Sequence, residues 1–310
     1  MLALEELNCY LCDSNELFPS DNFKKIAYLN LLYRFAKCDF CKSYSLFPKL
    51  DNEKIERMYS KEYSQISTDS PIGHDQEYLT KFLQLRKFLF SESKSSMKTF
   101  LDYGCGYNPV TLQFAREMGY IAQGVEFSED VVGEANEKNL GPVMGVKKFN
   151  SMKTNFDYVF MGDVIEHFVN PIHELKRIHE RVAQDGYLVA QGPLQGAFTV
   201  SHLLVNLKAQ ISRNKFSNFP PYHVSLATRK GMIALMSSTG FEIVNFKVGE
   251  KHWPAPTLKS AFKNFSLREF TIFAIKIVDR LISHVSRDYG SHYFLVAKKK
   301  EKIYSCNNLH

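Results

Sequence analysis

Residues 99–109, which read TFLDYGCGYNP, join a short apolar run to a turn that contains two glycines. The run Thr99–Tyr103 has the length and the side-chain types of a buried strand. Gly104 and Gly106 allow positive φ angles and let the backbone approach a ligand closely. Pro109 suits the first turn of a helix, where its missing N–H is not needed. The stretch therefore predicts a strand, a glycine turn and a helix in immediate succession.

The alternation of strand and helix continues toward the C-terminus. Beyond the first strand, the sequence pattern predicts strands at residues 121–126, 143–146, 156–161, 187–191, 241–246 and 292–297. It predicts helices at residues 109–118, 128–138, 170–183, 228–238 and 257–285, with an interruption at residues 192–223. Strands that alternate with helices are typical of a parallel sheet with crossover helices, so the sequence predicts an α/β domain.

A carboxylate follows the second predicted strand. Glu126 ends the run IAQGVE and comes twenty residues after Gly106. At the carboxyl edge of a parallel sheet, an acidic side chain in this place can accept hydrogen bonds from both hydroxyls of a ribose. The glycine turn and the carboxylate together indicate a nucleoside-containing cofactor. The alternative is a chance glycine turn followed by a surface glutamate.

Three motifs together resemble the class I S-adenosylmethionine-dependent methyltransferases, over about residues 100–298. They are LDYGCGYNP at residues 101–109, FDYVFMGDVIEHFVNP at residues 156–171, and DGYL at residues 185–188 followed by Gly192-Pro193. The resemblance implies a doubly wound, seven-stranded α/β fold whose last strand is antiparallel. It implies S-adenosylmethionine as the cofactor and leaves the methyl acceptor open.

The glycine turn departs from the family pattern at one position. Asn108 stands where the family commonly has a third glycine. Asparagine tolerates the left-handed region better than most residues, so the exchange is compatible with the turn. Pro109 takes the place of the last glycine in the G-x-G-x-x-G fingerprint of dinucleotide-binding proteins, which disfavours a dehydrogenase.

The resemblance also implies which loop residues contact the cofactor. Gly104 and Gly106 would lie beside its methionine part. Asp102 would position its amino group, directly or through water. Cys105 would be a small filler in the loop rather than a reactive thiol.

Four residues at the ends of the next strands complete the implied cofactor site. Glu126 would hold the ribose, and Phe127 would lie against the adenine. Asp163 and Val164, just past the fourth predicted strand, would flank the sulfonium.

Three further residues are candidates for catalysis of methyl transfer. Glu166 and His167 follow the fourth predicted strand, at the carboxyl edge where open α/β sheets bind ligands. His223 ends the interruption at residues 192–223, which we expect to form a roof over the pocket. Either histidine is a candidate general base near neutral pH. The alternative for each is an orienting or packing role.

Four cysteines near the N-terminus form two C-x-x-C pairs, Cys9 with Cys12 and Cys38 with Cys41, separated by 25 residues. Two chelating pairs of thiolates make a tetrahedral set suited to structural zinc, which predicts a small zinc-ribbon-like module. The alternatives are unpaired buried cysteines or disulfides. Cys306 lies outside this set.

The chain divides into four predicted parts. We expect a zinc-binding module at residues 1–50, a helical linker at 51–96, the methyltransferase domain at 97–300 and a tail at 301–310.

The net charge of +6 is a mild excess that does not identify a nucleic-acid binder. The sequence carries neither a signal peptide nor an apolar stretch of transmembrane length, so we expect a cytoplasmic protein with reduced cysteines.

Three hypotheses for function follow. The favoured one is methyl transfer to an oxygen or carbon of a small or saccharide-type acceptor, because the sequence has no dense cluster of Lys and Arg. The second is a zinc-dependent RNA methyltransferase, and the third is a non-catalytic binding module that retains the cofactor fold.

The apolar and basic helix near residues 270–285 would pack on the sheet or, alternatively, lie at a membrane surface. The oligomeric state stays open.

Overall fold

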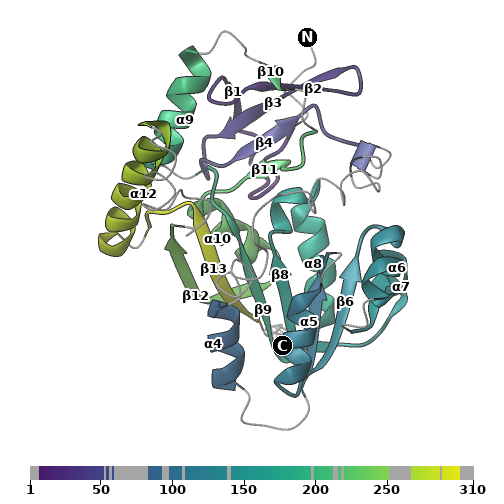
Figure 1. Cartoon of the computed structure of the whole chain (residues 1–310). Coiled ribbons are helices and arrows are strands. Elements are labelled where there is room, and N and C mark those ends of the chain that lie inside the picture. Colours follow the sequence, from purple (N-terminus) through teal and green to yellow (C-terminus); the bar gives the residue numbers. More distant parts are fainter. Residues whose placement is uncertain are drawn as a thin grey trace, which may run out of the picture.

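The protein is described by a computed structural model, shown in Figure 1. It describes residues 7–51, 54, 55, 58, 83–92, 98–106, 109–137, 141–196, 199–211, 216, 217, 220–250, 267–286 and 288–300. Several features expected from the sequence lie outside these residues: Asn108, most of the linker at 51–96, the first part of the helix at 257–285, and the tail with Cys306.

The larger sheet has seven strands. In spatial order they are β12 (Phe241–Gly249), β13 (His292–Lys299), β9 (Val182–Pro193), β8 (Phe156–Gly162), β5 (Thr99–Tyr103), β6 (Ile121–Glu126) and β7 (Val143–Gly145). The neighbours from β9 through β7 are parallel, whereas β13 is antiparallel to both β9 and β12. The predicted seven-stranded fold with an antiparallel last strand is confirmed.

Helices cover both faces of this sheet. One face carries α7 (Val146–Ser151), α8 (Pro171–Arg181) and α10 (Arg229–Ser238), and the other carries α4 (Leu83–Glu92), α5 (Val110–Glu117) and α6 (Glu129–Glu137). Successive residues of a strand point to opposite faces, so Leu101 joins the first core while Phe100 joins the second. The sheet is doubly wound because helices pack on both of its faces, each over its own buried core.

The sheet reverses its winding at β5. The chain runs from β5 through β6 to β7 on one side, then returns to place β8 and β9 on the other side of β5. At such a switch point the connections after β5 and β8 leave toward opposite faces, which opens a crevice at the carboxyl edge. The glycine turn after β5 and the segment after β8 therefore border the crevice in which this class of sheet binds ligands.

A second, smaller sheet lies above the carboxyl edge of the first (Figure 1). It is formed by β1 (Leu17–Ser20), β2 (Lys25–Tyr28), β3 (Leu31–Cys38), β4 (Tyr44–Phe47), β10 (Phe216–Ser217) and β11 (Ser225–Leu226). The first four strands come from the N-terminal fifty residues, and the last two come from the chain around His223. Two segments that are distant in the sequence thus build one sheet directly beside the crevice.

The structure differs from the sequence prediction most clearly at three places. Val146 begins α7 instead of ending a strand. β9 starts at Val182, before the expected turn at Asp185-Gly186, because the chain bulges where Phe156 pairs with Val182 and Tyr158 with Tyr187. The interruption at residues 192–223 contains a further helix, α9 (Val200–Ile211).

The last helix, α12 (Leu267–Val285), packs against α9 and β12, as the packing interpretation predicts. Its Asp279 carboxylate accepts hydrogen bonds from the backbone N–H groups of Val200 and Ser201, which fixes the start of α9. Within the described residues, every helix is too short or too polar to cross a membrane.

Candidate functional site

The glycine turn after β5 is attached to the end of β6. The N–H groups of Gly104 and Cys105 both donate to the carbonyl oxygen of Val125, at 2.8 and 3.1 Å. Gly104 has φ of +78° and Gly106 has φ of +69°, the left-handed region that glycine adopts without strain. Both positions therefore favour glycine on conformational grounds alone.

The two glycines differ in what surrounds them. A Cβ atom placed on Gly104 would lie 2.6 Å from Cγ2 of Val164, so the segment after β8 packs directly on the turn. A Cβ atom on Gly106 would meet no atom of the described residues within 4 Å. The turn is thus closed on the Val164 side and borders open space at Gly106, which fits a ligand seated against its backbone.

Glu126 faces this turn from the end of β6. Its carboxylate accepts hydrogen bonds from the N–H of Gly106 at 2.9 Å and from the N–H of Phe127 at 2.7 Å. Burial raises the pKa of Glu126, and the backbone hydrogen bonds act in the opposite direction. The acidic group and the glycine turn expected to form one site are therefore in contact.

Three other predicted residues surround the turn. Asp102 is buried in β5 and accepts a hydrogen bond from the hydroxyl of Thr111 in α5. Burial raises the pKa of the Cys105 thiol well above its usual range, which fits an unreactive filler. Phe127 is 43% exposed and meets Tyr103 edge to face, with ring centroids 5.7 Å apart. An exposed aromatic ring held in this way offers a face for a heteroaromatic base.

The segment after β8 begins at Asp163, which has φ of +56°. Its N–H donates to the carbonyl oxygen of Gln191 at 2.9 Å, so the bend is held by β9. Val164 follows, buried against Gly104. This geometry places Asp163 and Val164 at the crevice between β5 and β8.

The structure brings the three predicted catalytic residues together: Glu166, His167 and His223. Glu166 and His167 belong to the 3₁₀ turn η2 (Ile165–His167), and His223 reaches them from the far end of the 192–223 interruption. The imidazole rings of the two histidines are 4.9 Å apart between centroids and nearly perpendicular. One nitrogen or oxygen ligand atom from each of the three side chains lies within 4.8 Å of the others.

Hydrogen bonds orient both rings. His167 Nδ1 lies 2.8 Å from the carbonyl oxygen of Tyr222, which can only accept, so Nδ1 carries the proton. His223 Nδ1 lies 2.7 Å from the side-chain oxygen of Gln195 in the same arrangement. Burial lowers the pKa of His167, opposed by the Tyr222 carbonyl and by the charge of Asp163. His167 is therefore held as a neutral ring with its lone pair on Nε2.

Sequence reasoning did not single out Gln195, Tyr222 or Tyr293, which all adjoin these residues. Tyr293 is fully buried in β13, and burial raises the pKa of its phenol well above the usual value, with the charges of Glu166 and Asp163 adding to the effect. A Cβ atom on Gly192 would lie 3.3 Å from the Tyr293 hydroxyl and 3.4 Å from Oε2 of Glu166. Only the register of β13 against β9 brings Tyr293 here, and sequence patterning does not give that register.

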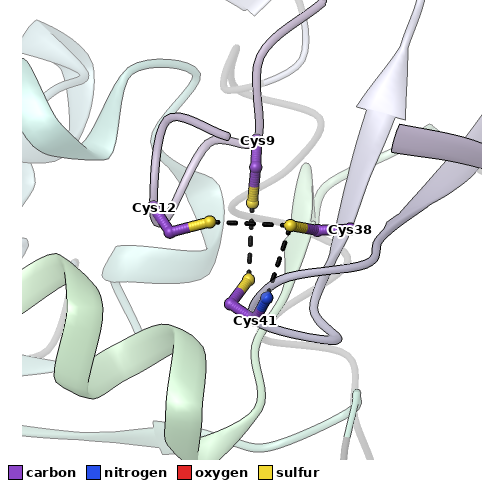
Figure 2. Close-up of side chains that lie close together, drawn as sticks. All are labelled: Cys9, Cys12, Cys38 and Cys41. Atoms are coloured by element: carbon purple, nitrogen blue, oxygen red, sulfur yellow. Dashed lines mark hydrogen bonds between the residues drawn. The ribbon is translucent and has the colours of Figure 1, made fainter. Parts of the chain in front are cut away.

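The four N-terminal cysteines converge on one point from two loops (Figure 2). Sγ of Cys9 lies 3.5 Å from Sγ of Cys41, and Sγ of Cys12 lies 3.6 Å from Sγ of Cys38. The N–H of Cys41 also points at Sγ of Cys38, at 3.4 Å, an interaction that stabilises a thiolate. The described structure thus has a compact four-cysteine cluster, with all four side chains as free cysteines.

The cysteine loops are joined to the start of α10. The Thr228 hydroxyl donates to the carbonyl of Cys41 at 2.6 Å and caps α10 by accepting from the N–H of Gly231 at 3.1 Å. The N–H of Thr228 donates to the hydroxyl of Ser43 at 3.0 Å. Cys9, Cys38 and Cys41 also belong to the same hydrophobic core as the face of the large sheet that carries α8 and α10. The cluster is therefore part of the framework of the molecule.

A doubly wound seven-stranded sheet, with a glycine turn after its first strand and an acid after its second, defines the class I S-adenosylmethionine-dependent methyltransferases. The sequence comparison agrees: residues 73–245 match the profile of the methyltransferase domain family. The chain belongs to this family and is an S-adenosylmethionine-dependent methyltransferase. A comparison with curated proteins gives no match.

Solved structures share the fold at low sequence identity. Magnesium protoporphyrin IX methyltransferase from Synechocystis PCC 6803, with bound S-adenosylhomocysteine, superposes with a TM-score of 0.52 at 14% identity, over 81% of this chain and all (100%) of that chain. A methyltransferase from Archaeoglobus fulgidus gives 0.48 at 20% identity, over 72% of this chain and 94% of that one. The plantazolicin methyltransferase BpumL gives 0.47 at 15% identity, over 80% and 94%. The first of these supports the fold and leaves the acceptor undetermined.

Proposed function

We propose that this enzyme transfers the methyl group of S-adenosylmethionine to an oxygen or carbon of a small or saccharide-type acceptor. The observation that carries the proposal is the meeting of Glu166, His167 and His223 within 4.8 Å of one another. Glu166 and His167 come two and three residues after Val164, at the edge of the crevice, and His223 joins them from the chain just before β11. Acid–base groups there stand on the acceptor side of a cofactor bound at the turn.

The residues around the turn fit S-adenosylmethionine. The space beside Gly106, open among the described residues, would admit the methionine part, and Asp102 precedes the turn at the end of β5. The Glu126 carboxylate holds the ribose hydroxyls, and the exposed ring of Phe127 stacks on the adenine. When bound, the cofactor supplies an electrophilic methyl group on a positively charged sulfur.

Methyl transfer asks the protein chiefly to align the acceptor with that methyl group. A hydroxyl or carbon acid must also lose a proton, and a neutral imidazole at the crevice can take it. His167 has its Nδ1 proton committed to the Tyr222 carbonyl, so the lone pair of Nε2 is on the other side of the ring. His223 is oriented in the same way by Gln195. These two rings are the candidates for acceptor activation.

We also propose that the four-cysteine cluster binds one structural zinc ion. A tetrahedral zinc with Zn–S bonds of about 2.3 Å needs neighbouring sulfurs about 3.8 Å apart. The observed separations of 3.5 and 3.6 Å fit this geometry. Four protein ligands leave no position for a substrate, so the ion would stabilise residues 1–50 and their contact with α10. Four thiolates need a reducing compartment, which favours the cytoplasm.

The acceptor class is tested by tritiated methyl transfer from S-adenosylmethionine to nucleotide sugars and to purified RNA, side by side. We expect label in a sugar acceptor, since the net charge of +6 is small for a nucleic-acid enzyme. Label in RNA alone would make the protein an RNA methyltransferase. Binding of S-adenosylhomocysteine without transfer to either acceptor would support a binding module instead.

A further inference from the structure

The side chains of Glu166, His167 and His223 are arranged as ligands of one ion. Glu166 and His167 are neighbours on η2, and His223 comes from a distant segment, so two segments bring three potential ligand atoms within 4.8 Å of one another. Nε2 of His167 lies 4.0 Å from Oε1 of Glu166. Two metal–ligand bonds of about 2.1 Å each can span a separation of up to about 4.2 Å. The Glu166–His167 spacing lies within this span, and the His223 ligand atom, within 4.8 Å of the other two, comes into reach when the side chains close in slightly around an ion.

The outer hydrogen bonds of the two histidines strengthen this view. A histidine that binds a metal through one nitrogen almost always donates its other N–H to a carbonyl, carboxylate or water. His167 donates from Nδ1 to the Tyr222 carbonyl at 2.8 Å, and His223 lies 2.7 Å from the Gln195 side-chain oxygen. In both rings Nδ1 faces a carbonyl-type oxygen and carries the proton. The lone pair of Nε2 then points away from that oxygen. Glu166 adds a buried carboxylate, 5% exposed, that offsets part of the charge of a cation.

We propose that Glu166, His167 and His223 bind a divalent transition-metal ion that activates a hydroxyl of the methyl acceptor. Two imidazoles and one carboxylate suit Mn²⁺, Fe²⁺, Co²⁺ or Zn²⁺, and three protein ligands leave coordination positions open. This inference rests on the proposed function for its chemistry. In this proposal the two histidine nitrogens bind the ion and do not themselves take the proton of the acceptor. The proposed metal site is separate from the four-cysteine cluster.

The chemistry balances without any further reactant. An acceptor hydroxyl on the ion has a lowered pKa, so its proton leaves to solvent water. The oxygen then forms a bond to the methyl carbon while the carbon–sulfur bond breaks and its electron pair stays on sulfur. The products are the methyl ether and S-adenosylhomocysteine. The proposed ion therefore restricts the methyl acceptor to molecules that carry a hydroxyl group.

The test is a titration of the full-length protein, with zinc already in its cysteine cluster, with Mn²⁺, followed by loss of the free Mn²⁺ electron paramagnetic resonance signal. Mn²⁺ prefers nitrogen and oxygen ligands and does not compete for thiolates. We expect one Mn²⁺ per chain. His167→Ala, His223→Ala and Glu166→Gln should each lower its affinity at least tenfold, whereas His173→Ala, at an exposed position on α8, should leave it unchanged.

Two further measurements separate the possible results. Circular dichroism and S-adenosylhomocysteine affinity should be unchanged in the three variants, which shows that they fold. Absence of Mn²⁺ binding, or binding that survives all three substitutions, would overturn the metal site and leave methyl transfer standing. Mn²⁺ binding as expected, in a protein that methylates no acceptor, would support the metal site and contradict the proposed function.

Discussion

The N–H of Val224 donates to the carbonyl oxygen of Glu166 at 2.9 Å, and the carbonyl oxygen of Val224 accepts from the N–H of Leu46 at 2.9 Å. Val224 thus bonds both to the edge of the crevice and to β4 of the smaller sheet. His223 immediately precedes it, so the position of this histidine depends on the N-terminal sheet. Cys38 of the four-cysteine cluster ends β3 of that sheet, and the carbonyl of Cys41 accepts a hydrogen bond from Thr228, only a few residues beyond Val224.

The first prediction concerns the metal of the cysteine cluster. Elemental analysis of the protein should find one zinc per chain, and Cys9→Ser or Cys38→Ser should remove it. The thermal midpoint should fall by on the order of 10 °C, because a closed metal site contributes several kcal/mol to folding. Cys105→Ser, outside the cluster, should keep its zinc. Unchanged zinc content in both cluster variants would refute the site.

The second prediction concerns Glu126. Glu126→Gln should weaken binding of S-adenosylhomocysteine by about 1.5–3 kcal/mol, the contribution of hydrogen bonds to a charged group. Glutamine keeps one oxygen that can accept from the Gly106 N–H, whereas its amide nitrogen replaces the oxygen that accepts from the Phe127 N–H, so circular dichroism has to show that the variant is folded. Calorimetry measures the affinity. A variant that binds as tightly as the wild type would exclude a ribose contact at this position.

The third prediction is the pH dependence of the same binding. Because burial raises the pKa of Glu126, its carboxylate starts to protonate at a higher pH than an ordinary glutamate. The protonated acid accepts ribose hydrogen bonds poorly, so affinity should fall as the pH is lowered from about 8 to about 5. Glu126→Gln has no proton to gain there, and its weaker binding should stay flat over this range. Equal pH profiles for the two proteins would show that another group causes the change.

The fourth prediction separates close packing from backbone strain at the glycine turn. Gly104→Ala places a methyl group on Val164 and also has to adopt φ of +78°, so cofactor binding should be lost or strongly weakened. Gly119→Ala is the control for backbone strain away from the site: φ there is +88°, and none of the residues that the structure describes comes within 4 Å of the new atom. Both variants should lose about 1 kcal/mol of stability from the left-handed conformation, and only Gly104→Ala should lose binding. Equal loss of binding in both would mean that strain alone matters.

The sequence predicted the large sheet well because each of its strands carries its own local signal. Thr99–Tyr103 and Ile121–Glu126 have the bounds expected from the apolar pattern, and α10 (Arg229–Ser238) starts within one residue of the helix predicted at 228–238. The smaller sheet was not predicted. Its strands are short, and β10 and β11 exist only because they pair with strands from the N-terminal fifty residues. Pairing between distant segments leaves no periodic trace in the chain.

The same distinction applies to the site. Glu126 and the glycines were found because they occur at strand ends, which the sequence pattern locates. The partners that orient the histidines, Gln195 and the Tyr222 carbonyl, come from the 192–223 segment, whose path over the crevice is set by tertiary contacts. Sequence position alone can suggest that His167 and His223 share a pocket, but it cannot give their tautomers.

The last prediction concerns turnover. His167→Ala and His223→Ala should each lower the methyl-transfer rate by roughly 10²–10⁴-fold with a hydroxyl acceptor, since each removes a group that activates it. Affinity for S-adenosylhomocysteine should change little, because neither ring adjoins Gly106 or Glu126 in the contacts that hold the turn.

The control for this experiment is His173→Ala, which removes an exposed imidazole from α8 and should retain full activity. An acceptor that is already nucleophilic, such as a neutral amine, needs little activation, so the two substitutions would then affect KM more than kcat. Near-normal turnover of a hydroxyl acceptor in both variants would leave methyl transfer in place and remove the histidines from it. A loss of turnover in only one variant would show whether His167 on η2 or His223 before Val224 activates the acceptor.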